Sequence, residues 1–169
     1  MSALVRITVK YFHDEDRIRL AGETEQGGIA VVWITRRLLD RLLSQLVGVL
    51  ENACVQTLGA DPLRAHTVQS FAQHAARIAS APQPPVRPQG EDEQWLAHSA
   101  DLIFAEGELR LSFRGDDRQH VELDFVDDKL RQFLNILLDV YRKAEWPLTA
   151  WPMWACSPDH SRRSVSELH

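Results

Sequence analysis

IRLAGETEQGGIAVVWITRRLLDRLLSQLVGVLENA, residues 18–53, decides the fold, because residues 109–144 repeat its plan as LRLSFRGDDRQHVELDFVDDKLRQFLNILLDVYRKA. The two segments align without a gap at an offset of 91 residues, and seven of the 36 positions are identical. The order of patterns is the stronger evidence. Both segments contain an alternating strand, a polar turn, a second strand, a capping residue and an amphipathic helix. We therefore predict two βββα units related by a pseudo-twofold axis.

The first unit is predicted from the N-terminal residues onward. Residues 4–12 and 17–23 alternate between apolar and polar side chains, and this period of two is typical of half-buried strands. Residues 29–34 are apolar throughout, which indicates a strand covered on both faces. Thr35 is a suitable N-cap for a helix over residues 36–53, where leucines recur at helical spacing.

The second unit repeats this order. Strands are predicted over residues 95–104, 109–114 and 120–126, and Asp127 is the predicted N-cap of a helix that runs to about Glu145. The connections between strands within each unit are too short for parallel crossovers, so we expect mainly antiparallel pairing.

An extra helix and a connector are predicted between the units. Asp61 followed by Pro62 is typical of a helix start, because a proline in the first turn loses no hydrogen bond. The predicted helix covers residues 62–80. Its apolar residues follow at spacings of mostly three and four: Leu63, Val68, Phe71, Ala75 and Ile78. Residues 81–90, APQPPVRPQG, contain five prolines or glycines and favour an extended, semi-rigid path.

These elements together predict an α+β domain, a mainly antiparallel sheet with helices packed on it plus the inserted helix. We expect a single domain over residues 1–156. It comprises half one at 1–60, the inserted helix and proline-rich connector at 61–94, and half two at 95–156. Residues 157–169 are polar and are expected to form a flexible tail.

The composition excludes some classes of function more readily than it suggests one. Hydrophobic residues make up 44% of the 169 residues and charged residues 25%, which is typical of globular proteins. The net charge of −5 argues against nucleic-acid binding, and no apolar run approaches the length of a membrane helix. Two distant cysteines, Cys54 and Cys156, form neither a disulfide framework nor a metal-binding spacing, so we expect a cytoplasmic protein.

No motif in the sequence indicates a catalytic, cofactor or metal site, and we expect none. Residues 13–16, HDED, combine an imidazole with three carboxylates, but consecutive residues in a turn point to different sides and are solvated. His66 and His74 are eight residues apart on the predicted inserted helix, whereas helical metal ligands are usually four apart.

Two features favour self-association. The leucine stripe of the predicted helix over residues 36–53 is wider than one packed side needs, and residues 145–154 contain three of the five tryptophans. The tryptophan-rich segment, residues 145–154, could fold back on its own chain or dock on a neighbouring subunit or a protein partner. The candidate interface residues are Leu38, Leu42, Val49, Trp146, Trp151 and Trp154.

The leading hypothesis is therefore a non-catalytic binding or assembly module that forms a homo-oligomer. A rival hypothesis is a small enzyme with a site between the two repeats. A third is a weak nucleic-acid binder that uses an arginine patch. The arginines of that patch are Arg17, Arg19, Arg36, Arg37, Arg110 and Arg114.

Overall fold

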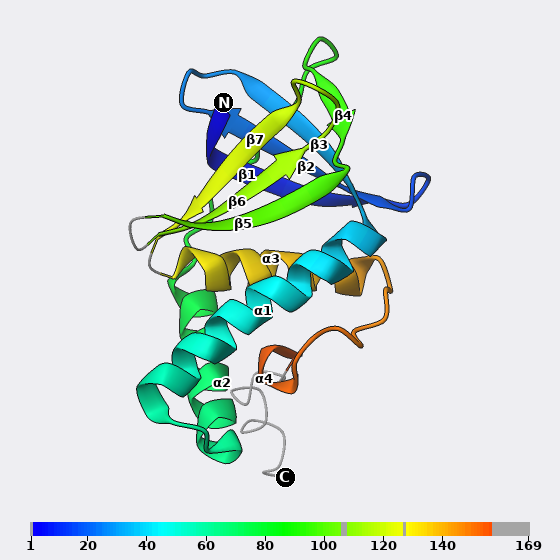
Figure 1. The fold of residues 1–169 in the computed structure, drawn as a ribbon. Helices are drawn as coiled ribbons and strands as arrows, with labels where there is room; N and C mark the ends of the chain where they lie inside the picture. The colour runs from blue at the N-terminus through cyan, green and yellow to red at the C-terminus, as the bar shows by residue number, and fades with distance from the viewer. Residues whose placement is uncertain (1, 106–107, 127, 157–169) are drawn as a thin grey trace.

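A computed structural model gives the fold and describes residues 2–105, 108–126 and 128–156 (Figure 1). Within them, seven strands form one curled sheet, and four helices accompany it. The strands are β1 Ser2–Phe12, β2 Arg17–Thr24, β3 Ile29–Thr35, β4 Gln94–Leu96, β5 Ser99–Ala105, β6 Glu108–Arg114 and β7 His120–Phe125. The helices are α1 Arg36–Leu58, α2 Pro62–Ala79, α3 Lys129–Lys143 and α4 Met153–Cys156. The predicted mixed α+β class is confirmed.

The order of strands in the sheet is β4-β3-β2-β1-β7-β6-β5. Its two end strands, β4 and β5, are consecutive in the sequence and are joined through Ala97 and His98. The backbone N–H of Ala97 donates to the carbonyl of Trp33 at 2.8 Å, and that of His98 donates to the carbonyl of Arg114 at 2.8 Å. One short segment therefore bonds to both β3 and β6, which brings the two ends of the curled sheet together.

Pairing is antiparallel within each half and parallel between the halves. β1, β2 and β3 pair antiparallel in succession, as do β5, β6 and β7. β1 pairs parallel with β7, and β3 pairs parallel with β4. In each parallel pair, at least two helices lie between the two strands in the sequence. Parallel strands require a long connection of this kind.

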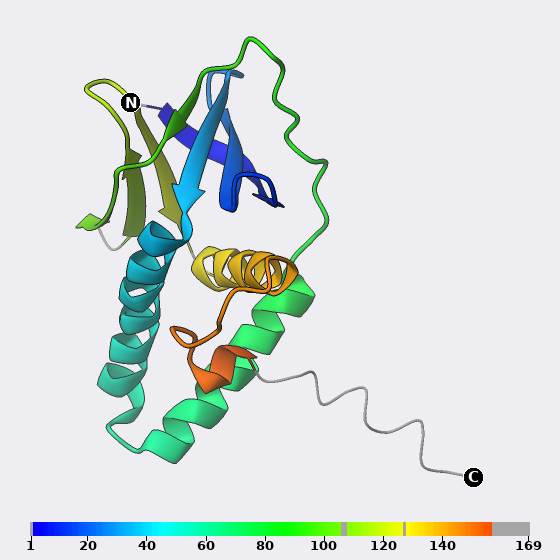
Figure 2. The same cartoon turned by 90° about the vertical axis from the view of Figure 1, so that its right-hand side faces the viewer.

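The helices lie on one side of the sheet, and the sheet face on that side is called here the inner face (Figures 1 and 2). α3 runs directly beneath the sheet, while α1 and α2 extend away from it as a hairpin. The core lies where the inner face meets α1 and α3, and it is almost entirely aliphatic and aromatic. Its fully buried side chains include Ile18, Leu20, Ile34, Leu111, Phe113, Leu39, Leu46, Leu134 and Tyr141.

Most element positions follow the sequence-based predictions, with small differences. Thr35 caps α1 by accepting a hydrogen bond from the Leu38 N–H at 3.3 Å, as predicted, but α1 continues to Leu58. The predicted strand over residues 95–104 is two strands, because the chain bends at residues 97–98 to bond to both neighbours. The predicted cap Asp127 and the predicted tail at 157–169 lie outside the described residues.

The proline-rich connector lies on the outer face, opposite the helices. The N–H of Val86 donates to Oγ1 of Thr8 at 2.8 Å. Thr8, Ala21 and Val31 lie side by side in the strand register, so the connector covers this row of β1, β2 and β3. This cover explains why β3 is apolar on both faces, as its sequence predicted.

Candidate functional site

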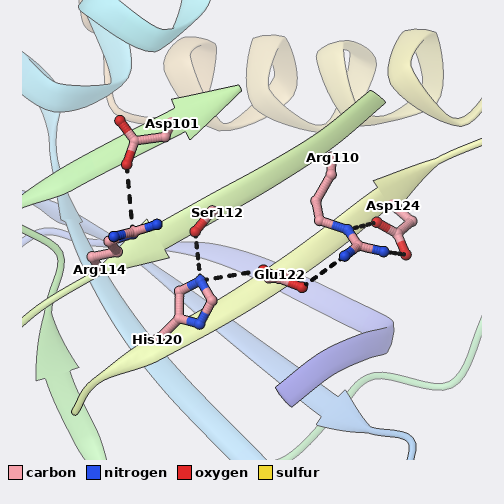
Figure 3. Close-up of polar contacts among 7 residues, drawn as sticks. All are labelled: Asp101, Arg110, Ser112, Arg114, His120, Glu122 and Asp124. Carbon is pink, nitrogen blue, oxygen red and sulfur yellow. Dashed lines mark hydrogen bonds and ion pairs between the residues drawn. The ribbon is translucent and has the colours of Figure 1, made fainter. Parts of the chain in front are cut away.

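The outer face of β6 and β7 carries a row of bonded polar side chains (Figure 3). Because side chains alternate along a strand, the apolar residues of β6 and β7 point into the core and their polar neighbours point outward. Nε and Nη2 of Arg110 bind the two carboxylate oxygens of Asp124 at 2.6 and 3.0 Å. Its Nη1 lies 3.2 Å from Glu122 Oε2. The hydrogen bonds to Asp124, and then its negative charge, raise the pKa of Arg110.

A serine, a histidine and a glutamate meet in the same row. Ser112 Oγ lies 2.6 Å from His120 Nε2, and Glu122 Oε1 lies 3.4 Å from the same nitrogen (Figure 3). In a catalytic triad the hydroxyl and the carboxylate bind opposite nitrogens of the imidazole, so that one proton can be taken while the other is held. Here both oxygens face one nitrogen, and Ser112 is fully buried. The geometry therefore favours cross-strand bonding over nucleophilic catalysis.

Sequence reasoning missed this cluster, although its signal is present. Residues 110, 112 and 114 and residues 120, 122 and 124 are polar at every second position between apolar ones. The pattern predicts an outward polar face, and the antiparallel register then places Ser112 opposite Glu122 and Arg114 opposite His120. The register cannot be read from one strand alone.

Helix α2 turns its apolar side outward. The helix and its start are as predicted: Asp61 accepts hydrogen bonds from the N–H groups of the first turn, and Pro62 follows it. Of its large apolar side chains, Leu63 is 77% exposed, Phe71 is 76% exposed and Ile78 is 72% exposed. The apolar stripe that the sequence showed on this helix is thus exposed in the described chain. We call Leu63, Val68, Phe71, Ala75 and Ile78 the α2 stripe.

The opposite side of α2 is polar and buried. The side-chain amide of Gln73 donates to the carbonyl of Arg131 at 2.9 Å and to Oδ1 of Asn135 at 3.0 Å, both on α3. Gln69 donates to the carbonyl of Leu50 on α1 at 2.8 Å and accepts from Nη2 of Arg131 at 2.6 Å. Buried polar groups with matched partners fix the rotation of a helix, because any other rotation leaves them unbonded. The outward direction of the stripe is therefore set by hydrogen bonds.

A cleft opens where β1 and β7 part. The two strands are in register for two pairs, Ser2 with Val121 and Ala3 with Glu122, and then diverge. A cavity of about 420 Å³ lies beyond this point, within the usual range for ligand sites. Its walls are consecutive residues of β1 (4–9) and β7 (123–125), the start of α3 and the beginning of the connector.

The cleft lies between the two halves, where the enzyme hypothesis places a site. Its charged lining residues are Arg6, Asp124 and Lys129. Arg6 Nη2 binds Glu23 at 2.7 Å, and Asp124 is held by Arg110. A general acid or base must be able to exchange a proton with a substrate, and these two bonded groups favour a binding role over proton transfer.

The candidate interface residues lie in or against this chain's own core. Leu42, Trp146, Trp151 and Trp154 are buried, and Leu38 and Val49 are partly buried against the core cluster. The tryptophan-rich segment thus folds back on its own chain. Nε1 of Trp154 donates to Glu51 of α1 at 3.0 Å, and the Trp154 ring lies under the guanidinium of Arg131 at 5.8 Å.

The turn at residues 13–16 has a structural role that the sequence did not reveal. Oδ1 of Asp16 accepts from Nε1 of Trp146 at 2.9 Å and from the hydroxyl of Tyr11 at 2.9 Å. These hydrogen bonds, that of Trp146 first, lower the pKa of Asp16. The turn is exposed as predicted, but Asp16 anchors the tryptophan-rich segment.

The arginines of the nucleic-acid hypothesis do not form one patch. Arg17 and Arg19 are on β2, whereas Arg110 and Arg114 are on β6, and β1 and β7 lie between these strands. Arg110 binds Asp124, and Nε of Arg114 lies 3.6 Å from Asp101 (Figure 3). Arg36 and Arg37 begin α1, where Arg36 lies 3.5 Å from Asp40.

The histidines and cysteines of the described residues likewise do not assemble into a metal site. In the described part of the chain, no group of three or more His, Cys, Asp or Glu side chains could hold a metal ion. Cys54 and Cys156 are both free thiols, and burial raises the pKa of Cys156, which disfavours its reactive thiolate form.

Comparison with known proteins gives no relative: no family model, curated protein or solved structure matches this chain. Of the helices in the described residues, none is both long enough and apolar enough to cross a lipid bilayer.

Proposed function

We propose that this protein is a non-catalytic binding and assembly module that self-associates through the α2 stripe. The observation that carries the proposal is the rotation of α2, which exposes Leu63, Phe71 and Ile78 and buries Gln69 and Gln73. Scattered apolar residues are normal on a surface, but an ordered apolar stripe along a fixed helix is typical of an interface.

The spacing of the stripe suits a second copy of the same chain. A twofold interface requires a patch that is complementary to itself. Phe71 lies eight residues after Leu63 and seven before Ile78, so it marks the middle of the stripe. Two antiparallel α2 helices that cross near Phe71 would place Leu63 of one copy against Ile78 of the other. Val68 and Ala75 continue the three–four spacing of a helix–helix seam.

The interface would extend beyond α2. A stable interface of ordinary size buries about 800 Å² on each partner, which is more than one helical stripe supplies. Val55 on α1 is 47% exposed and Met153 on α4 is 79% exposed, and both elements adjoin α2. We therefore include these two side chains in the proposed contact.

Light scattering and sedimentation across the micromolar range test this proposal. Wild type should be dimeric, and Phe71→Glu should be monomeric, because a charge at the centre of an apolar seam cannot be solvated. His66→Glu is the matched control: it adds the same residue to the same helix, on its flank, and should remain dimeric. A monomeric wild type throughout this range would contradict self-association.

The proposal includes the pseudo-twofold duplication. What supports it is the equivalence of the parallel pairings: Ala3 pairs with Glu122, and Gln94 pairs with Val31. The offset of 91 residues converts one pair into the other. A gene fusion of two βββα units would produce this relationship, and separate expression of the halves would test it. The halves should associate with each other if each retains the pairing edge of the ancestral unit.

A further inference from the structure

The walls of the β1–β7 cleft are edges of strands. Successive side chains of a strand point to opposite faces of the sheet, yet consecutive residues of β1 (4–9) and of β7 (123–125) all line the cavity. The cavity therefore lies in the plane of the sheet, between the two strands. Along β1, alternate residues bond to β2, and the remaining N–H and C=O groups point into the split.

The equivalent seam on the other side of the sheet is closed. β3 and β4 are in register for three pairs, and the chain then continues its bonding through Ala97. By the offset of 91 residues, Trp95 in the second half is the equivalent of Leu4 in the first half. Trp95 is buried and packs so closely on Gly115 that a Cβ there would lie 2.7 Å from its ring. A smaller residue, Leu4, stands at the open seam.

We propose that the β1–β7 cleft binds an extended acidic peptide segment of a partner protein, which adds to the edge of β1 as a strand. A strand edge presents a row of backbone N–H and C=O groups in fixed directions. The backbone of another extended strand can bond to all of them in register. The six β1 residues that line the cleft extend over about 20 Å at the usual rise per residue, which is enough for a short strand.

The charge of the lining selects an acidic peptide. The lining holds two cations, Arg6 and Lys129, and one carboxylate, Asp124. Asp124 is bound by Arg110 and Arg6 is bound by Glu23, so Lys129 is the charged lining residue that is left to attract a carboxylate. Lys129 is the first residue of α3, so the positive end of that helix adds to its charge. The proposed site thus offers one cation, Lys129, to an acidic side chain of the peptide, although the whole chain carries a net charge of −5.

The apolar part of the lining suits the other face of the peptide. Phe125, Phe133 and Ile136 lie on one side of the cavity, from the end of β7 and along α3. An added strand with alternating acidic and apolar residues would direct its apolar side chains towards them. This site is separate from the proposed dimer contact, since no residue of the α2 stripe lines the cleft.

The direct test uses the synthetic peptide acetyl-Val-Glu-Val-Glu-Val-Glu-Val-amide, with the lysine peptide acetyl-Val-Lys-Val-Lys-Val-Lys-Val-amide as its charge control. Amide NMR spectra of the full chain should shift at β1 and β7 with millimolar glutamate peptide, and hydrogen exchange along β1 should slow. The lysine peptide should bind about tenfold more weakly or not at all. Equal binding of both peptides, or no shift at β1 with the glutamate peptide, would overturn the proposal.

Backbone methylation separates strand addition from a purely electrostatic contact. Two further glutamate peptides carry N-methyl groups on all glutamates or on all valines, which removes the donors of one edge or the other. One of them should lose binding, because a strand added to β1 uses a single edge for that ladder. Unchanged binding of both methylated peptides would overturn the proposal.

Two pairs of variants locate the peptide. Ile136→Trp should fill the cleft and abolish binding, whereas Ile136→Leu keeps the volume and should bind normally. Lys129→Glu should weaken the glutamate peptide about tenfold and improve the lysine peptide. Lys143→Glu, at the far end of the same helix, should leave both affinities unchanged. Binding that survives Ile136→Trp in a correctly folded protein would place the peptide elsewhere and overturn the assignment. The dimer proposal is unaffected by these outcomes, because light scattering tests it independently.

Discussion

The hydroxyl of Tyr141 on α3 donates a hydrogen bond to Oδ1 of Asp40 on α1 at 2.8 Å, across 101 residues of sequence. The Tyr141 ring is completely buried and meets Trp146 and Trp151 edge-on, with centroid distances of 5.2 and 5.4 Å. Burial first, and then the bond to Asp40, raise the pKa of Tyr141 far above its ordinary value. One ring therefore joins α1, α3 and the tryptophan-rich segment.

Removal of this hydroxyl should weaken the fold without opening a large cavity. Tyr141→Phe keeps the ring and is expected to lower the free energy of unfolding by about 1.5–3 kcal/mol, the usual value of a hydrogen bond to a charged group. Urea unfolding measures the change. Tyr11→Phe is the control, because Tyr11 also donates to an aspartate, Asp16, but this hydrogen bond is exposed and the Tyr11 side chain is only partly buried. A loss as large for Tyr11→Phe would show that burial of the hydroxyl does not matter.

The acid stability of the tryptophan-rich segment should depend on Asp16. The pKa of Asp16 is lowered in the folded state, so its carboxylate stabilises the fold above its ordinary pKa of 3.8. This contribution is lost as the pH falls through the lowered pKa. Asp16→Asn keeps an acceptor for Trp146 but cannot titrate, so the acid side of its stability profile should be flatter. Unfolding midpoints, followed by tryptophan fluorescence between about pH 5 and pH 2, measure this difference.

A matched variant controls for net charge in that experiment. Asp14→Asn removes one carboxylate from the same turn, where no hydrogen bond links Asp14 to Trp146. Its profile should retain the slope of the wild type. If Asp14→Asn and Asp16→Asn flatten the profile equally, the effect comes from net charge and not from the bond to Trp146.

The sequence predicted the elements well, because their signals are local. Alternation marked the strands, and Thr35 and Asp61 marked the helix starts through bonds to the next few residues. The parallel pairings between halves were not predicted. They depend on how distant segments meet, which no local pattern contains.

The same distinction applies to the residues predicted for an interface. Periodicity showed that both α1 and α2 carry an apolar stripe, but it does not tell what a stripe contacts. Leu42 belongs to the core, whereas Phe71 faces outward, because Gln73 finds its partners on α3. The tryptophan-rich segment is similar: its composition predicted a contact surface, and the bonds of Trp146 and Trp154 decide that this surface is its own chain.

The rotation of α2 should depend on Gln73. In Gln73→Leu, Oδ1 of the buried Asn135 loses its donor, whereas Nδ2 keeps its bond to the backbone carbonyl of residue 73. An unbonded buried polar group costs about 1–3 kcal/mol. The double variant Gln73→Leu with Asn135→Leu removes both polar groups and should recover part of this loss. Urea unfolding of the wild type, both single variants and the double variant gives the coupling energy. A coupling of zero would mean that this bond does not hold α2 in place.

Cysteine crosslinking should show the antiparallel arrangement of two α2 helices. In a Cys54→Ser, Cys156→Ser background, Phe71→Cys lies near the proposed twofold axis and should form a disulfide-linked dimer rapidly on oxidation. Leu63→Cys and Ile78→Cys should crosslink to each other in a mixture faster than either does alone. Disulfides require Cα atoms about 4.4–6.8 Å apart, so the rates report proximity. Gel electrophoresis without reductant measures them. His66→Cys, on the flank of α2, should crosslink slowly, and an equal rate there would rule out this seam.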